Sequence, residues 1–322
     1  MSATVLPGLA FVVRAQTPDR TYRIGVLGAV RLDTPVAARV WDAFRLELQR
    51  RGWFEGRNIA FDHRSADGDD ERWPGLAQEL IERRVDLIVV AAGTGALAVK
   101  AATRTIPVVF TIVPDPVGQG VVANLARPGG NLTGVGSMSL ELAGKRLELL
   151  KETFPRIARV ALLPYANEST DTVHRAANLD VARAARSLGL QLLPARVQRA
   201  DDLERAVGAL HDADAWYVQD DILYVQYTAA VLRLLAAQRK PAIFAQTFYV
   251  EAGGLMSYAV DLPDQFRRAA IYVDRILRGA RPADLPVELP RRFELSYNLQ
   301  TAKAFGLTIP ALMLRRADKL FE

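Results

Sequence analysis

The feature that most constrains the fold of this chain is a regular alternation between short β-branched runs and longer segments with helical periodicity. Residues 22–27 (YRIGVL) form the first such run and are typical of a buried strand. The segment that follows is amphipathic, because its large apolar residues recur every four positions: Val36, Val40, Phe44 and Leu48. Strands and helices that alternate in this way favour a parallel sheet joined by right-handed crossovers.

The alternation occurs twice along the chain. The first half has strand patterns at 22–27, 58–63, 86–90 and 107–113, and helical patterns at 36–51, 73–84, 95–104 and 117–126. After a stretch of small residues at 133–139 the pattern restarts, with strands at 158–163, 190–197, 215–219, 242–246 and 254–258 and helices at 142–152, 170–188, 200–211, 227–238 and 261–278. A chain of 322 residues is long enough for two lobes, and we predict that each is a doubly wound α/β sheet.

Several kinds of chemistry are excluded or disfavoured by what the sequence lacks. It contains no cysteine, so disulfides, thiolate metal sites and cysteine nucleophiles are impossible. Its three histidines fall in separate predicted elements, which disfavours a metal centre or a histidine-based catalytic site. The first strand ends in Gly28-Ala29-Val30, without the glycine spacing of a dinucleotide site, and there is no phosphate loop or nucleophile elbow. We therefore expect no catalytic residues, no cofactor and no metal.

The net charge of +5 does not indicate a nucleic-acid partner. The basic residues form only short clusters near predicted helix ends and loops, such as Arg50-Arg51 and Arg291-Arg292, which is typical of a solvated surface. No uncharged apolar run reaches the ~20 residues that a helix needs to cross a bilayer. We therefore expect no integral membrane segment.

The first fifteen residues are typical of a secretory signal peptide. An apolar stretch at 4–13 is followed by Arg14 and Ala15, so Val13 and Ala15 occupy the third and first positions before a cut after Ala15. No lysine or arginine precedes Arg14, so either the true start lies upstream or the segment is not a signal. We predict a signal peptide at 1–15, truncated at its start, and a periplasmic protein.

Polar and aromatic residues follow the predicted strands at their carboxyl ends, where doubly wound sheets bind ligands. The first half contributes Thr94, Asp115 and Ser137, and the second half contributes Tyr165, Asn167, Asp220, Gln246, Phe248 and Tyr258. These residues come from both halves and include no recognisable catalytic set. We predict that they form a ligand-binding pocket between the lobes.

Some of these residues also have a purely structural explanation. Asp115 precedes Pro116, which is the pattern of a helix N-cap, and Asn167 lies just before the predicted helix at 170–188. Asp220 and Asp221 follow an apolar strand. Such a pair either caps a helix or accepts hydrogen bonds from a ligand's ammonium group, and the sequence leaves both alternatives open.

The polar residues favour a small solute with a polar or charged head and an apolar or aromatic body. Thr94, Ser137 and the backbone amides near Gly95 can donate to an anionic head at the start of a helix. Asp220 can accept from an ammonium or hydroxyl group, and the aromatic rings can form flat apolar walls. We expect a solute of the amino-acid or aromatic-acid type.

Six stretches of the sequence resemble one family of transport proteins. They are RTIPVVF (104–110), DPVGQGVVANLARPGGNLTG (115–134), GKRLELLKE (144–152), EAGGLMSY (251–258), RRAAIYVDRILRGARPADLPVE (267–288) and FELSYNLQTAKAFGLTIP (293–310). In these stretches the chain resembles the substrate-binding proteins of ABC transporters, in the branch with tryptophan- and tyrosine-type binding components and the type 1 periplasmic binding fold. The stretches are specific to the family and uninformative about the ligand.

The resemblance implies two α/β lobes that are joined by three hinge strands and close over a small solute. The first lobe would comprise 22–136 and about 258–284, and the second 137–257 and about 285–322, with hinges at 133–139, 253–257 and 281–290. Relatives often have Leu-Pro-Asp-Pro where this chain has Val218-Gln219-Asp220-Asp221, and a glycine where it has Ala259. Both departures lie near the expected pocket, so the aromatic amino-acid ligand of the family does not transfer directly.

The function implied by the resemblance is capture of a solute for an ABC importer, without catalysis. The partners would be the solute, a permease and its ATPase, and the protein itself would be a monomer. The alternative is a ligand sensor of the same fold that acts on a regulatory partner. Sugar-responsive repressors of this kind carry a helix-turn-helix before the core, whereas an apolar, proline-containing segment precedes the first strand here.

Overall fold

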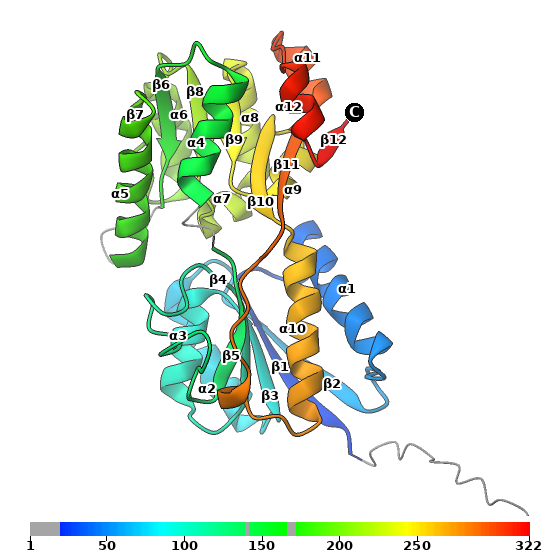
Figure 1. Cartoon of the computed structure of the whole chain (residues 1–322). Helices are drawn as coiled ribbons and strands as arrows, with labels where there is room; N and C mark the ends of the chain where they lie inside the picture. The colour runs from blue at the N-terminus through cyan, green and yellow to red at the C-terminus, as the bar shows by residue number, and fades with distance from the viewer. Residues whose placement is uncertain (1–19, 139–141, 166–171) are drawn as a thin grey trace, which may run out of the picture.

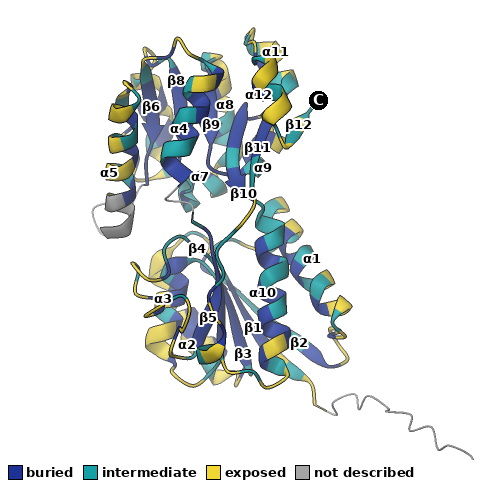
Figure 2. Cartoon of the chain, viewed as in Figure 1, coloured by how far each residue is buried: buried dark blue, intermediate teal, exposed yellow. Residues whose placement is uncertain are grey.

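The computed structural model describes residues 20–138, 142–165 and 172–322. The chain folds into two α/β lobes, one above the other in Figure 1, and each lobe is built on its own sheet. The predicted fold class, two doubly wound lobes on mostly parallel sheets, is confirmed. Figure 2 shows that the sheets are buried within each lobe, whereas exposed residues lie on the outer faces of the helices and in loops.

The first lobe contains a parallel five-stranded sheet in the order β2-β1-β3-β4-β5. Its strands are β1 (Tyr22–Gly28), β2 (Ile59–Ser65), β3 (Leu87–Ala91), β4 (Val108–Val113) and β5 (Leu132–Gly136). Its helices are α1 (Pro35–Arg50), α2 (Trp73–Glu82), α3 (Gly93–Ala102) and α10 (Leu262–Leu277), with 3-10 turns η1 (Asp70–Arg72) and η3 (Pro282–Asp284). Helices α1 and α10 pack together on one face of the sheet, and α2 and α3 cover the other (Figure 1).

The second lobe contains a seven-stranded sheet in the order β12-β11-β10-β9-β8-β6-β7, which is parallel except between β10 and β11. Its strands are β6 (Arg159–Leu163), β7 (Gln191–Pro194), β8 (Ala215–Val218), β9 (Ala242–Phe244), β10 (Met256–Val260), β11 (Phe293–Asn298) and β12 (Lys319–Phe321). Its helical segments are α4 (Leu142–Thr153), α5 (Thr172–Ser187), η2 (Ala200–Asp202), α6 (Leu203–Ala209), α7 (Ile222–Gln226), α8 (Thr228–Gln238), α9 (Thr247–Glu251), α11 (Leu299–Phe305) and α12 (Ala311–Arg316).

The composition of the central strands follows from their position. Strand β3 reads LIVVA, and its first four residues are buried because helices cover both faces of the sheet. Side chains on successive residues alternate between the two faces. Leu87 and Val89 accordingly join the cluster beneath α1 and α10, while Ile88 and Val90 join the cluster beneath α2 and α3.

The chain crosses between the lobes three times, as the resemblance implied, although two boundaries differ from the prediction. Residues 258–260 belong to the second lobe, because β10 pairs with β9 and β11. The hinge predicted at 253–257 therefore lies within that lobe, and the crossing follows Val260, directly before α10. Residues 285–288 belong to the first lobe, since the amides of Val287 and Glu288 donate to Leu125 and Gly134 at 2.7 and 3.0 Å.

One predicted helix is wrong. Residues 117–126 form turns and bends rather than a helix. The Asp115 carboxylate accepts from the Gly118 amide at 2.8 Å, which closes a turn at the end of β4. Gly120 then adopts a left-handed conformation, with φ of 72°, which an α-helix cannot contain.

Candidate functional site

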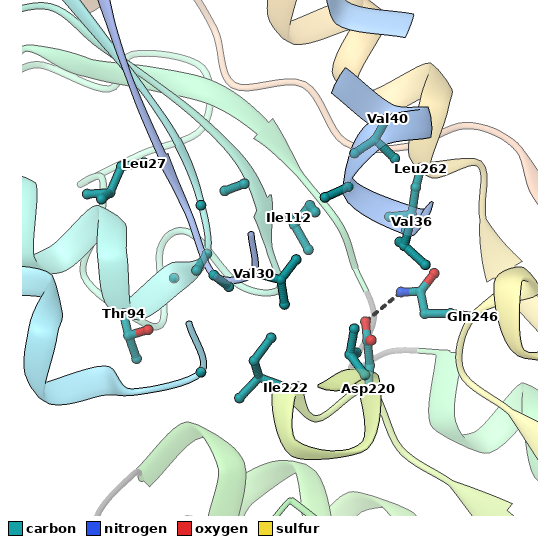
Figure 3. Close-up of a pocket in the computed structure, with 18 of the residues that line it drawn as sticks. Leu27, Val30, Val36, Val40, Thr94, Ile112, Asp220, Ile222, Gln246 and Leu262 are labelled. Carbon is teal, nitrogen blue, oxygen red and sulfur yellow. Dashed lines mark hydrogen bonds between the residues drawn. The ribbon is translucent and has the colours of Figure 1, made fainter. Parts of the chain in front are cut away.

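A cavity of about 230 Å³ lies between the two lobes, at the carboxyl ends of strands from both sheets. Figure 3 shows side chains of α1, α3 and α10 approaching it from the first lobe, and the segments after β8 and β9 approaching it from the second. On one side of it the lobes are also linked by an ion pair between Arg39 on α1 and Glu251 on α9. The predicted position of the pocket agrees with this location.

The walls of the cavity are mainly apolar. The first lobe supplies aliphatic and aromatic side chains from several elements or their ends, including Val30, Val36, Trp41, Ile112 and Leu262, and the second lobe supplies Ile222, Val225 and Phe248. Trp41 is held in place by neighbouring rings: it stacks on Phe44 and meets Phe61 edge-on, with ring centroids 4.8 Å apart in each case. A preformed aromatic wall of this kind suits an apolar or aromatic solute.

The second lobe presents a carboxylate and an amide to the cavity. Gln246, at the end of β9, donates from Nε2 to the carboxylate of Asp220, after β8, at 2.5 Å (Figure 3). Burial raises the pKa of Asp220 above its usual range, whereas the bond from Gln246 and the nearby Arg146 guanidinium act in the opposite direction. Burial outweighs these favourable contacts, so the carboxylate is only partly compensated in the unliganded protein.

The first lobe presents a second carboxylate. Asp70, on the loop that follows β2, accepts from the Trp73 indole at 2.7 Å and from the Thr94 hydroxyl at 3.2 Å. Thr94 lies in the first turn of α3, so the Asp70 carboxylate sits beside the start of that helix. The Thr94 hydroxyl is therefore already engaged by a carboxylate of the protein itself.

Five of the nine predicted residues line the cavity: Thr94, Tyr165, Asp220, Gln246 and Phe248. Asn167 lies outside the described residues. The other three, Asp115, Ser137 and Tyr258, are not among the residues that line it. Whether the five bind a solute remains a prediction, since their position establishes only that they face the space between the lobes.

The three residues outside the lining have structural contacts. Asp115 closes the turn after β4, so the capping alternative describes its role, although it caps a turn rather than a helix. Ser137 is fully buried after β5, and its amide donates to Val113 at 2.8 Å. Tyr258, on β10, packs against Phe293 with ring centroids 5.9 Å apart.

Several lining residues were missed by the sequence analysis. Val36 and Trp41 belong to the apolar stripe of α1 and were indistinguishable from core positions. Asp70 could have been predicted as a site residue from the sequence, because it follows β2 in a polar segment (ADGDD) at the same edge of the sheet as the other candidates. Asp221 lines the cavity and also caps α7, with its carboxylate accepting from the Leu223 amide at 2.8 Å, so the capping alternative holds for it and a bond to a ligand stays a prediction.

Two further observations concern the part of the chain that the structure describes. It contains no group of three histidine, aspartate or glutamate side chains placed to hold a metal ion. None of its helices is both long enough and apolar enough to cross a membrane.

Comparison with known proteins places this fold and cavity in a family. The family model for ABC transporter substrate binding proteins matches residues 24–321. A tyrosine-binding protein of Clostridioides difficile is 25% identical over 278 residues, which cover 86% of this chain and 79% of that protein.

Two solved structures superimpose on this chain over most of its length. A conserved domain protein of Vibrio cholerae superimposes with a TM-score of 0.86 at 27% identity, over 94% of this chain and 100% of that one. An ABC domain of Streptococcus pneumonia in complex with L-Trp superimposes with a TM-score of 0.84 at 25% identity, over the same shares. The two lobes have the type 1 periplasmic binding protein fold, and the chain belongs to the family of ABC transporter substrate-binding proteins.

Proposed function

We propose that this protein is the extracytoplasmic solute-binding component of an ABC importer, which captures a small solute between its lobes and delivers it to a permease with its ATPase. The observation that carries the proposal is the cavity of about 230 Å³ enclosed by strand ends of both lobes. A site divided between two lobes couples solute binding to lobe closure, because the solute contacts both halves only when they approach. A permease can distinguish the closed form from the open one.

The chemistry of the cavity supports binding rather than catalysis. Its walls are mainly apolar, and its polar contacts include the Asp220–Gln246 pair and the Asp70–Thr94 pair. Neither pair provides an activated nucleophile, since each carboxylate only accepts a hydrogen bond from an amide or a hydroxyl. We infer that the protein is a monomeric carrier without enzymatic activity.

The solute that fits these walls has an amino group and an apolar or aromatic body. Asp220 can accept from an ammonium group, and the rings of Trp41 and Phe248 can flank the body of the solute. The names of two similar proteins also support an aromatic solute with an amino group, since one is a tyrosine-binding protein and the other was solved with L-Trp.

A combined binding and uptake experiment tests this function. Amino acids, aromatic amines and aromatic acids are screened for thermal stabilisation of the purified protein. A true ligand at about 100 times its Kd should add about 2.7 kcal/mol to the free energy of unfolding. Deletion of the gene should then abolish uptake of that compound by cells, and expression of the intact gene should restore it. Uptake that persists unchanged in the deletion strain would contradict the import function.

Export is proposed from the pattern at 1–15, which lies outside the described residues. Cleavage after Ala15 predicts a mature chain that begins at Gln16 and is recovered from the periplasm. Intact-mass measurement of protein from a periplasmic fraction checks this start. Full-length chain found only in the cytosol would contradict export.

The affinity for an amine-bearing solute should fall on acidification. Because burial raises the pKa of Asp220, its carboxylate takes up a proton above the usual pH range and then no longer attracts an ammonium group. Arg146 opposes this shift and Asp221 adds to it. Calorimetric titrations from about pH 8 to about pH 5 should show progressive weakening, which Asp220→Asn should flatten.

Acidification should have the opposite effect on the unliganded fold. A carboxyl whose folded pKa is raised contributes stability below its unfolded pKa and loses that contribution as the pH rises through the folded pKa. The Asp220 contribution to the free energy of unfolding should therefore improve as the pH falls, while binding weakens. Equal weakening of binding in the wild type and in Asp220→Asn would show that another group controls the pH dependence.

A further inference from the structure

The charged side chains that face the cavity all have the same sign. Among the described residues that line it, the charged ones are Asp70, Asp220 and Asp221, and none is lysine, arginine or histidine. A solute that enters this cavity therefore meets carboxylates from both lobes and, among the described lining residues, no cationic side chain.

Two buried side-chain oxygen atoms at the cavity are acceptors without a hydrogen-bond partner among the described residues. Gln246 is only 2% exposed, and its Oε1 atom has no partner in the part of the chain that the structure describes. Its amide orientation is fixed by the Asp220 carboxylate, which requires the Nε2 donor on its side. Gln119, which also lines the cavity, has a buried Oε1 atom that no described residue contacts by a hydrogen bond. Buried acceptors of this kind need donors, and the solute is the group that can supply them.

Three side-chain donors of the cavity, by contrast, are engaged by carboxylates of the protein. The Thr94 hydroxyl and the Trp73 indole both donate to Asp70, and the Gln246 amide donates to Asp220. The backbone amides at the start of α3 could attract a carboxylate, but Asp70 lies beside them through its bond to Thr94. A second carboxylate at this position would therefore face a like charge.

Arg146 does not add a cationic side chain to the lining of this cavity. It is 2% exposed and lies near Asp220 in the second lobe, where it donates to the carbonyl oxygens of Tyr258 and Ala245 at 2.8 and 3.2 Å. It is not among the residues that line the cavity between the lobes.

We propose that the cavity selects organic cations, namely amines with an apolar or aromatic body and no carboxylate, over the corresponding amino acids and acids. The proposal rests on the proposed solute-binding function and narrows its ligand class. The ammonium group would lie against Asp220 and the free oxygen of Gln246, and the apolar body against the wall that contains Trp41.

Matched sets of compounds test the head group separately from the body. One set is tryptamine, L-tryptophan and indole-3-propionate, and the other is phenethylamine, L-phenylalanine and 3-phenylpropionate. Kd values are measured by calorimetry with the purified mature protein. We expect each amine to bind at least about 10-fold more tightly than its amino acid, and the acids to bind more weakly than both, because a like-charge contact typically costs more than 1.4 kcal/mol.

A variant tests the cause of the selectivity. Asp70→Asn keeps an oxygen that can accept from Thr94 and Trp73 but removes the charge beside α3. It should reduce the preference for the amine over the amino acid by several-fold. Asp33→Asn is the control, because Asp33 is an exposed carboxylate paired with Arg31 and does not itself line the cavity, and it should leave the preference unchanged.

The outcomes separate this inference from the proposed function. Amino acids that bind as tightly as their amines, or more tightly, overturn the cation preference and leave the solute-binding function intact. Failure of all six compounds to bind also overturns it, while the uptake experiment still decides the function. A preference for amines that Asp70→Asn leaves unchanged overturns the role given to Asp70.

Discussion

Replacement of Asp220 by asparagine is expected to weaken the binding of an amine-bearing solute by about 10- to 150-fold. Asp220 is a half-buried carboxylate at the cavity, and it accepts a hydrogen bond from the Gln246 amide at 2.5 Å. A hydrogen bond to a charged group contributes about 1.5–3 kcal/mol, which corresponds to this range of Kd. Asparagine has nearly the same shape, and Gln246 can rotate its amide to pair with it, so the fold should persist.

Calorimetry with the wild type and the variant measures this effect, and Asp115→Asn provides the matched control. Asp115 is also an aspartate after a strand of the sheet, but it closes a turn outside the cavity lining. The control should bind normally. Normal affinity in Asp220→Asn, combined with a lower Tm, would mean that Asp220 serves the fold rather than the solute.

A lysine in place of Ile222 is expected to abolish amine binding, with a loss of at least about 100-fold. Ile222 projects into the middle of the cavity from the start of α7, close to Asp220 (Figure 3). The new ammonium group would neutralise the carboxylates and occupy the space of the solute, and disruption of a buried charge pair costs about 2–5 kcal/mol. Because the lysine gains carboxylate partners, the unliganded protein should lose little stability.

The same variant should also reverse the selectivity of the cavity, from amines to acids. Ile222→Lys should bind indole-3-propionate more tightly than the wild type does, because the cavity then contains a cation. Ile222→Met keeps the volume and apolar character of the side chain and should bind amines within a few-fold of the wild type. Unaltered amine affinity in Ile222→Lys would place the binding site elsewhere.

The two-lobe fold could be predicted from the sequence because its signals are local and repeated. Runs such as LIVVA in β3 and the four-residue spacing of Val36, Val40, Phe44 and Leu48 in α1 specify element type without any knowledge of the partner. The apolar residues of 117–126 predict a helix, although the segment also contains Gly118 and Gly120. In the structure Gly120 adopts a left-handed conformation that ends any helix there.

The candidate site was only partly predictable, for a geometric reason. Asp220, Gln246 and Thr94 lie at strand ends, where the topology directs them to the cavity. Tyr258 also lies on a strand near the cleft, but its side chain packs with the core of the second lobe beside Phe293. The wall formed by Val36 and Trp41 depends on which part of α1 faces the opposite lobe, and no sequence periodicity encodes that.

The central claim is that a small solute binds between the two lobes, and a crystal structure of the protein with its tightest-binding compound tests it most directly. The account predicts one molecule in the cavity, with its amine beside Asp220 and the Gln246 oxygen and its apolar body against Trp41. A molecule bound on the outer surface of one lobe, with the space between the lobes filled by solvent, would contradict it.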